Sequence, residues 1–90
     1  MEKYSNPKIV QKLANKHNLG SVQISTRKDK KYMIRDSTNK LIHFGQLGYE
    51  DYTVHKDKTR LKNFKKRNAK WKNAPKNSPA WLSYHLLWAD

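Results

Sequence analysis

The stretch SVQISTRKDKKYMIRDSTNKLIHFG, residues 21–45, decides the fold of this chain. In its first part, Val22, Ile24 and Thr26 alternate with polar residues, which is the period-two pattern of a half-buried strand. Two more short runs rich in aromatic and branched residues follow, and clusters of turn-forming residues separate the three runs. The runs lie at 22–26, 32–35 and 41–44, and the turns at 28–30 and 36–40. The stretch therefore predicts a three-stranded antiparallel meander.

Upstream of the meander, residues 7–18 have the pattern of an amphipathic helix. Asn6 followed by Pro7 is typical of a helix start, because the Asn side chain accepts a backbone N–H and proline suits the first helical position. Gly20 supplies a stop after the helix. Apolar residues recur at helical spacing at Ile9, Val10, Leu13 and Ala14.

Downstream of the meander, the sequence predicts a basic helix over residues 58–72. Asp57 or Thr59 can cap its start, and the segment ending at Pro75 stops it. Lys and Arg cover most of its surface. One face is different and consists of Leu61, Phe64, Asn68 and Trp71.

Ser78 followed by Pro79 repeats the cap-plus-proline start and opens a last helix, predicted over residues 79–89. This helix is apolar or aromatic nearly all round, so it is either buried or docks onto another chain. Together these elements predict an α+β fold in one small domain spanning residues 1–90, in the order helix, meander, basic helix, apolar helix.

The composition excludes several classes of protein. Cysteine is absent, which rules out disulfides, cysteine zinc sites and thiol catalysis. No apolar run reaches the roughly 20 residues of a membrane span, and the N-terminus lacks the apolar core of a signal peptide. We therefore expect a soluble protein inside a cell or in a particle assembled there. Three Trp, five Tyr and two Phe indicate a folded core rather than a disordered basic tail.

The net charge of +13 points to a polyanionic partner. Basic residues concentrate at 27–35 and 56–76, whereas 77–90 contain none. Each Lys or Arg that neutralises a phosphate releases condensed counterions, which favours binding without regard to base sequence. We therefore predict nucleic-acid binding, with DNA favoured, through the first hairpin and the basic helix. The residues expected to carry it are Arg27, Lys28, Lys30, Lys31, Arg60, Lys62, Lys65, Lys66, Arg67 and Lys70.

Four aromatic-rich and basic blocks carry a family resemblance. They are STRKDKKYMIRD (25–36), IHFGQLGYEDYTVHKD (42–57), RNAKW (67–71) and SPAWLSYHLLW (78–88). Across residues 20–88 the chain resembles a family of small, basic, uncharacterised proteins encoded by large and giant nucleocytoplasmic DNA viruses. The resemblance implies a viral source and a role in the virion, or in the host cytoplasm or nucleus during infection. It implies no activity.

Histidines and carboxylates gather between the hairpin and the basic helix. They allow a ββα-metal nuclease, in which a histidine activates water and Asp51, Asp57 or Asn68 holds Mg²⁺. No nuclease motif appears in a recognisable register, and capping by Asp57 and pairing of Asp51 with a nearby Lys or Arg explain the acids structurally. We expect the structural roles, and hence no enzyme, no metal and no cofactor. The cluster consists of His43, Glu50, Asp51, His55 and Asp57.

The apolar C-terminal helix suggests a second class of function. A chain this short would have difficulty burying every face of the helix, so we predict a homodimer. Other virion proteins are further candidate partners, which would make this a minor capsid-associated protein. The basic helix has too few apolar residues for membrane binding, so no membrane partner is expected. The predicted interface consists of Trp81, Tyr84, His85 and Trp88.

Aromatic residues in and after the hairpin allow two interpretations. Tyr32, Phe44, Tyr49 and Tyr52 could form a stacking platform for single-stranded nucleic acid. Alternatively Tyr32 and Phe44 face the core, as strand residues of this kind usually do. The second interpretation is favoured, and the three tryptophans are assigned mainly to the core as well.

Overall fold

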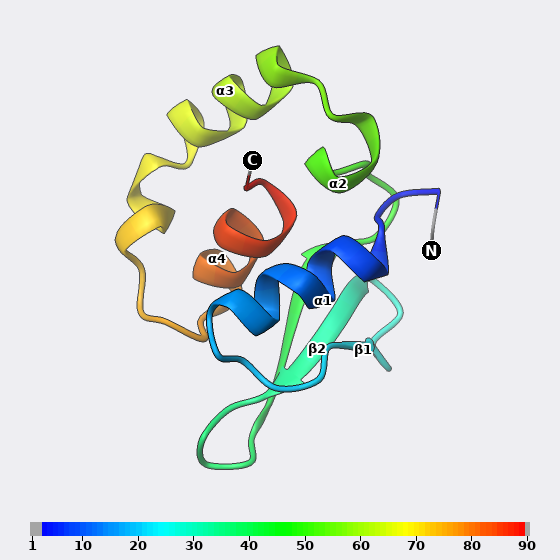
Figure 1. Ribbon diagram of the computed structural model, residues 1–90, viewed down its shortest axis with the longest axis vertical. Coiled ribbons are helices and arrows are strands. Elements are labelled where there is room, and N and C mark those ends of the chain that lie inside the picture. Colours follow the sequence, from blue (N-terminus) through cyan, green and yellow to red (C-terminus); the bar gives the residue numbers. More distant parts are fainter. Residues whose placement is uncertain (1–2, 90) are drawn as a thin grey trace.

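Three antiparallel strands in the order β1–β2–β3 form an open sheet that carries the helices of the chain (Figure 1). The computed structural model describes residues 3–89. It confirms the predicted α+β architecture and the order of its main elements. In chain order these are α1 (Pro7–Lys16), β1 (Gln23–Ile24), β2 (Lys30–Arg35), β3 (Leu41–Gln46), α2 (Tyr52–His55), α3 (Lys58–Arg67), η1 (Ala69–Asn73), α4 (Pro79–Leu82) and η2 (Ser83–Leu87).

One face of the sheet forms the floor of the core. Tyr32 lies opposite Phe44 in the β2–β3 register, and their ring centroids are 5.7 Å apart. Ile34 lies on the same face as Tyr32, because alternate strand residues point the same way. All three are buried, which confirms that Tyr32 and Phe44 face the core. Burial raises the pKa of the Tyr32 hydroxyl to about 12.

The first strand is shorter than predicted. β1 contains only two residues, Gln23 and Ile24, and both are exposed. Ile24 is 53% exposed, and only Val22 of the alternating residues packs partly against the core. Alternating residues form a buried face only where another layer covers the strand. β1 is an edge strand that pairs with β2 over two residues, and both of its residues stay exposed.

The three predicted helix starts are confirmed. The side chains of Asn6, Asp57 and Ser78 each accept backbone N–H groups at the start of α1, α3 and α4. Each cap satisfies an N–H that the helix itself leaves unpaired, which typically contributes about 1 kcal/mol. The bonds measure 3.1 Å from Lys8 N, 2.9 Å from Thr59 N and 3.2 Å from Trp81 N.

α1 ends at Lys16, slightly earlier than predicted. Asn18 adopts the left-handed conformation with φ of 58°, and the Leu19 N–H donates to the Ala14 carbonyl at 2.9 Å. Asparagine tolerates this conformation better than most residues, so it ends the helix where Gly20 was expected to.

α3 ends at Arg67 rather than at residue 72. Asn68 donates twice to the Phe64 carbonyl, from its backbone N–H at 3.0 Å and from its side-chain amide at 3.1 Å. Such a side-chain bond to the backbone competes with continuation of the helix. The chain goes on as the 3₁₀ turn η1, so Trp71 does not continue the apolar face of an α-helix.

The C-terminal helix changes character after one turn. α4 is α-helical, but η2 is π-helical, with hydrogen bonds that span five residues. Leu82, Leu86 and Leu87 are buried with Val10 of α1 in the core. α1 and this C-terminal segment therefore pack side by side against the sheet (Figure 1). No helix within residues 3–89 is both long and apolar enough to cross a membrane.

Candidate nucleic-acid interface

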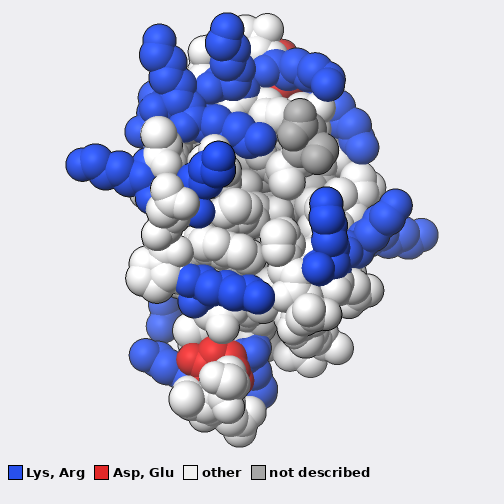
Figure 2. Space-filling view, turned by 60° about the vertical axis from the view of Figure 1, so that its left-hand side comes forward, with Lys and Arg blue, Asp and Glu red and all other residues white. Residues whose placement is uncertain are grey.

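Positive charge covers much of the surface. Figure 2 shows Lys and Arg side chains around a central area made of other residues, with little acidic surface in view. Because the chain has 20 basic and seven acidic residues, 13 basic side chains would lack an acidic partner even if every acid were paired. Solvent ions or a bound polyanion must balance that surplus.

The densest exposed charge lies on α3 and η1, which we call the basic arm (residues 58–73). Lys62 and Lys66 are one helical turn apart and therefore lie on the same face. On its inner side the arm is anchored by the buried Leu61 and by Phe64, which stacks on Trp88. The exposed basic residues that point to solvent are Lys58, Lys62, Lys66, Arg67, Lys70 and Lys72.

Two predicted ligands on the arm already make contacts within the chain. Lys65 is half-buried, with its Nζ 5.7 Å from the centre of the Tyr84 ring. Arg60 donates from Nη1 to Glu50 Oε1 at 3.3 Å, and both side chains stay nearly half exposed. An exposed pair of this kind is worth at most about 1 kcal/mol, so it constrains Arg60 only weakly.

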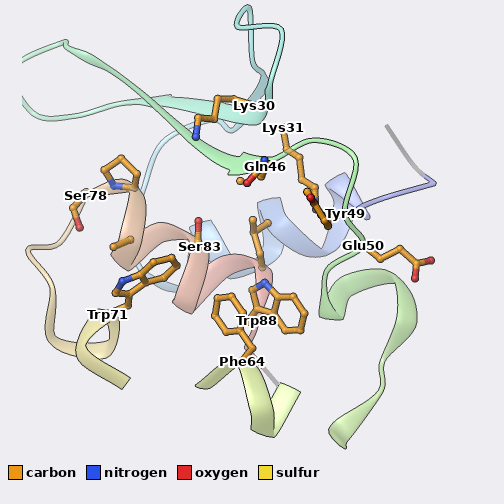
Figure 3. A pocket seen from close by; sticks show the side chains of 14 residues that line it. Lys30, Lys31, Gln46, Tyr49, Glu50, Phe64, Trp71, Ser78, Ser83 and Trp88 are labelled. Carbon is orange, nitrogen blue, oxygen red and sulfur yellow. The ribbon is translucent and has the colours of Figure 1, made fainter. Parts of the chain in front are cut away.

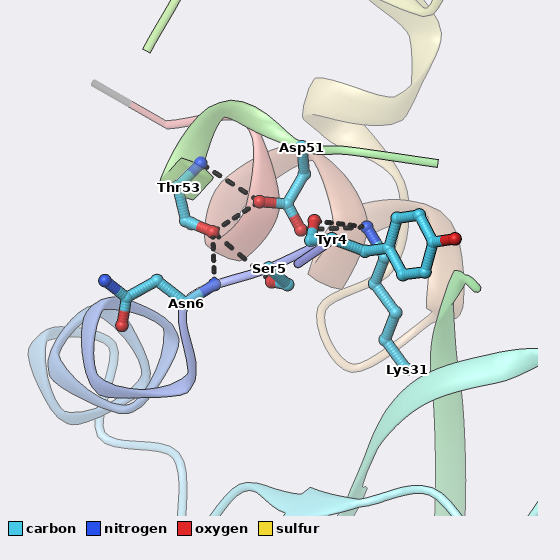
Figure 4. Close-up of polar contacts among 6 residues, drawn as sticks. All are labelled: Tyr4, Ser5, Asn6, Lys31, Asp51 and Thr53. Atoms are coloured by element: carbon cyan, nitrogen blue, oxygen red, sulfur yellow. Dashed lines mark hydrogen bonds and ion pairs between the residues drawn. The ribbon is translucent and has the colours of Figure 1, made fainter. Parts of the chain in front are cut away.

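Lys31, the fourth basic residue of the predicted hairpin site, is only 2% exposed. Its Nζ lies 3.0 Å from Asp51 Oδ2 and donates to the Tyr4 carbonyl at 3.2 Å (Figure 4). Breaking a buried pair costs about 3–5 kcal/mol, so a phosphate cannot recruit this lysine cheaply. Burial thus removes Lys31 from the predicted surface, while the expected pairing of Asp51 with a basic residue is confirmed.

Asp51 also organises the start of α2. Its Oδ1 accepts the Thr53 hydroxyl and, at 3.0 Å, the Thr53 backbone N–H. Thr53 Oγ1 in turn accepts the Asn6 N–H at 2.8 Å and lies 3.3 Å from Ser5 Oγ (Figure 4). This network ties the N-terminal segment, β2 and α2 together, and it holds the chain that leads from β3 to the basic arm.

The hairpin turn is the other predicted basic element. Arg27 and Lys28 are exposed at the turn, and Lys30 is half-buried at the start of β2. The hairpin residues therefore separate into an exposed pair, Arg27 and Lys28, the half-buried Lys30 and the buried Lys31.

An open pocket of about 640 Å³ lies between the basic arm and the end of the sheet (Figure 3). Phe64 and Trp71 reach it from the arm, Lys30 from β2, Gln46 from β3, and Trp88 from the end of the chain. The pocket therefore joins the two elements that the sequence identifies separately as basic.

Aromatic rings form one side of this pocket. Phe64 and Trp88 stack in parallel, with ring centroids 4.3 Å apart and an interplanar angle of 5°. Trp71 meets Phe64 edge-on at 5.9 Å and 76°. Tyr49, which is 66% exposed, lines the pocket from the loop after β3. The pocket thus offers several aromatic surfaces to a planar ligand.

The histidines and carboxylates do not assemble into a metal centre. Within residues 3–89, no three His, Asp or Glu side chains are placed to hold a metal ion. His43 Nδ1 lies 2.7 Å from Ser25 Oγ, and His55 Nδ1 accepts the Asp57 N–H at 2.9 Å. Burial lowers the pKa of His55. The two aspartates have the predicted structural roles, because Asp51 pairs with Lys31 and Asp57 caps α3.

The C-terminal aromatic residues proposed for an oligomer interface are largely covered within the chain. Tyr84 is 9% exposed, and Trp88 stacks on Phe64. Trp81 and His85 contact each other with ring centroids 4.3 Å apart. The sheet, α1 and the basic arm together cover much of this helix within one chain, while Trp81, His85 and Trp88 stay partly exposed.

The sequence pattern indicates neither the pocket nor the short helix α2. The sequence pattern places three aromatic residues, Phe64, Trp71 and Trp88, on apolar faces. It does not show that the elements carrying them leave a pocket open between them. The available signal was the presence of aromatic residues beside the basic blocks.

Comparison with known proteins identifies a family. No curated protein and no solved structure matches the chain. Residues 20–68 match a family described as a family of unknown function (DUF5754). The matched segment contains the sheet, the Lys31–Asp51 pair and α3, and it ends before η1 and the C-terminal helices. Because this match spans more than half of its 90 residues, the chain belongs to the family of unknown function DUF5754.

Proposed function

We propose that this protein binds nucleic acid, preferentially double-stranded DNA, chiefly through its exposed lysines and arginines on the phosphate backbone. The observation that supports this function is the basic arm, where exposed basic side chains follow one another along α3 and η1. The exposed hairpin turn adds Arg27 and Lys28.

The dimensions of the arm suit a backbone contact. α3 has ten residues and is therefore about 15 Å long. Duplex DNA carries one negative charge for about every 1.7 Å of its axis, so the arm can follow several phosphates. Besides Arg60, which pairs with Glu50, the arm carries six exposed basic residues.

The source and place of action belong to the same proposal. The sequence blocks quoted above resemble small basic proteins of large DNA viruses. A viral protein of this charge, packaged in the virion, would act in genome packaging or early in infection, in the host cytoplasm or nucleus.

The first experiment titrates the protein into a labelled duplex of about 30 base pairs. Binding is measured by fluorescence anisotropy at each concentration of a salt series. We expect log K to fall with log salt concentration at a slope of about −4 or steeper, because each neutralised phosphate contributes about −0.9. Absence of binding at low salt would contradict the function. Running the series with and without Mg²⁺, and examining the DNA on a gel, also tests the expectation that the protein is not a nuclease.

Matched triple variants test whether the arm itself is the interface. Lys62, Lys66 and Lys70 changed to Gln should make the slope less steep by about 2.7 and weaken binding roughly a hundredfold or more near 0.1 M salt. The control changes Lys8, Lys12 and Lys16, exposed on α1, to Gln and removes the same charge. Equal losses in the two variants would show that net charge, and not the arm, determines binding.

The alternative function is a minor capsid-associated protein that acts through protein contacts. It requires an uncovered C-terminal helix, and much of that helix is covered within the chain, so it has less support than nucleic-acid binding. The homodimer stays a prediction. Sedimentation equilibrium over a concentration series tests it, and a monomer throughout the series would contradict it.

A further inference from the structure

The pocket beside the basic arm has the size of a site for a small ligand. Ligand pockets in proteins typically measure about 300–1,000 Å³, and this one measures about 640 Å³. A purine or pyrimidine with its sugar fits within that volume. A base that is paired within a duplex cannot enter the pocket, because the neighbouring base pairs cover its faces.

The lining favours a planar ring. Trp71 is half-buried and Tyr49 is 66% exposed, so both keep ring surface available in the pocket. Figure 3 shows Trp71 on one side of the pocket, with Phe64 and Trp88 beside it. Stacking of a base on aromatic rings does not depend on which base is present, since every base has a π face.

The polar residues around the pocket favour a ligand that carries a phosphate. Lys30 lines the pocket from β2 and brings a positive charge to it. Gln46 and Ser83 supply groups that can donate or accept hydrogen bonds at the edge of a base. Glu50 also lines the pocket, but Arg60 lies 3.3 Å from its carboxylate and offsets its charge.

The position of the pocket connects it to the backbone-binding surface. One wall belongs to the basic arm through Phe64 and Trp71, and the other begins at Lys30, next to the exposed turn. The pocket therefore lies between the basic arm and the exposed turn, and a strand that contacts both elements passes its mouth. An apolar peptide would fit the rings but would gain nothing from the surrounding positive charge.

We infer that the pocket receives one unpaired nucleobase of the bound nucleic acid, stacked on an aromatic ring of its lining, either Trp71 or Tyr49, with an adjoining phosphate near Lys30. The inference rests on the proposed function, because the arm must first hold the strand. It adds that the protein distinguishes DNA with an extrahelical or unpaired base from DNA that is fully paired.

Three labelled duplexes test the inference by anisotropy. The first is fully paired, the second carries one unpaired thymidine, and the third carries an abasic residue at the same place. The second and third have the same number of phosphates and the same interruption of the helix. We expect the unpaired thymidine to be bound about 5- to 100-fold more tightly than the abasic residue, which is the range of one stacked base.

The outcomes separate the inference from the proposed function. Equal affinity for the thymidine and abasic duplexes, with tight binding of the paired duplex, would overturn the inference alone. Failure to bind any of the three at low salt would overturn the proposed function.

Matched variants assign the effect to the pocket. Trp71→Ala should remove most of the preference for the unpaired thymidine, whereas Trp71→Phe should keep most of it. Because Trp71 also touches Phe64, Tyr49→Ala is the second variant, and its exposure makes a folding defect unexpected. Each variant is checked by circular dichroism.

A charge pair completes the design. Lys30→Gln should reduce the preference, while Lys28→Gln, two residues away at the exposed turn, should weaken binding of the thymidine and abasic duplexes equally. A preference that survives Trp71→Ala, Tyr49→Ala and Lys30→Gln would place base recognition elsewhere and contradict the inference.

Discussion

The end of the sheet beside α2 and the basic arm both hold lysines, and the two regions use them in opposite ways. At the sheet end, Lys31 is 2% exposed and lies 3.0 Å from Asp51. On the basic arm, Lys62 and Lys66 are exposed on one helical face. The same residue type therefore holds the fold together in one region and supplies surface charge in the other.

The difference follows from the free energy of hydration. A charge that leaves water loses several kcal/mol, and a well-placed partner must offset that loss. A lysine on the surface keeps its hydration and can exchange counterions for phosphates. A count of basic residues therefore predicts phosphate-binding residues only at positions that remain exposed, and Lys31 is buried.

The largest expected effect comes from removing the partner of the buried lysine. Asp51→Ala leaves the Lys31 ammonium buried without a carboxylate and also removes the cap of α2. We expect the free energy of unfolding to fall by about 3–5 kcal/mol, a large part of the total for a small domain. Urea denaturation, monitored by tryptophan fluorescence, measures the free energy of unfolding.

Asp57→Ala is the control for this experiment, because Asp57 caps α3 on the exposed basic arm. We expect it to lose only about 1 kcal/mol. Losses of the same size in the two variants would mean that the Lys31–Asp51 pair stabilises the fold no more than a surface cap does.

A smaller effect tests how tightly the sheet end is packed. An added Cβ at Gly45 would lie 2.8 Å from Leu87 Cδ1 and 3.2 Å from Lys31 Cβ, and Gly45 has a φ of +79°. We expect Gly45→Ala to lower the free energy of unfolding by about 2–4 kcal/mol, from overpacking and backbone strain together. Thermal and urea unfolding provide the measurement.

Gly48→Ala is the matched variant. Its φ of +99° also strains an alanine, but nothing lies within 4 Å of the added Cβ. We expect a loss of about 1–2 kcal/mol from the backbone alone. If Gly48→Ala destabilised the protein as much as Gly45→Ala, the sheet end would not be tightly packed around Lys31.

Lowering the pH should destabilise the protein through two histidines, His17 and His55, which contact Trp81 and Trp88 respectively. Burial lowers the pKa of His17, and the nearby His85, Lys76 and Lys16 lower it further. Burial also lowers the pKa of His55. Because the unfolded chain binds these protons more readily, stability should be complete above pH 6.5 and should fall as the pH decreases below it.

Melting temperatures at pH 7.5 and pH 5.5 measure this decrease, over a range in which the carboxylates stay largely ionised. A double variant with His17→Gln and His55→Gln should show a smaller decrease than the original protein. An equal decrease in both proteins would assign the pH dependence to other groups.

The smallest effect on stability is expected on the basic arm. Lys62, Lys66 and Lys70 changed to Gln should alter the free energy of unfolding by no more than about 0.5 kcal/mol, as is usual for exposed positions. The same variant should lose most of its DNA affinity. A stability loss as large as that of Asp51→Ala would remove the contrast between the two regions.

The elements that the sequence predicted correctly are those governed by local rules. Asn6, Asp57 and Ser78 cap helices because their side chains reach backbone N–H groups only two or three residues away. Tyr32 and Phe44 face the core because strand alternation and turn spacing place them there. These features need no knowledge of distant parts of the chain.

The sequence-based predictions differ from the structure where a competing hydrogen bond or a distant segment determines how an element ends or which side chain is buried. Asn68 bonds back to Phe64 and ends α3 early, and a stretch that alternates like a strand pairs over only two residues in β1. The distant Asp51 draws Lys31 into the interior. Each depends on a competition between interactions of similar strength, which residue patterns do not resolve.

Composition and neighbouring residues along the chain are enough to predict the α+β class, the helix starts, the core face of the meander and the surplus of 13 positive charges. Three-dimensional packing sets which lysine is buried, how far the C-terminal aromatics are covered by their own chain, and that a pocket joins the hairpin to the basic arm. The physical reason is that burial and cavity shape depend on how separate elements pack, and packing is set by contacts between residues far apart in sequence.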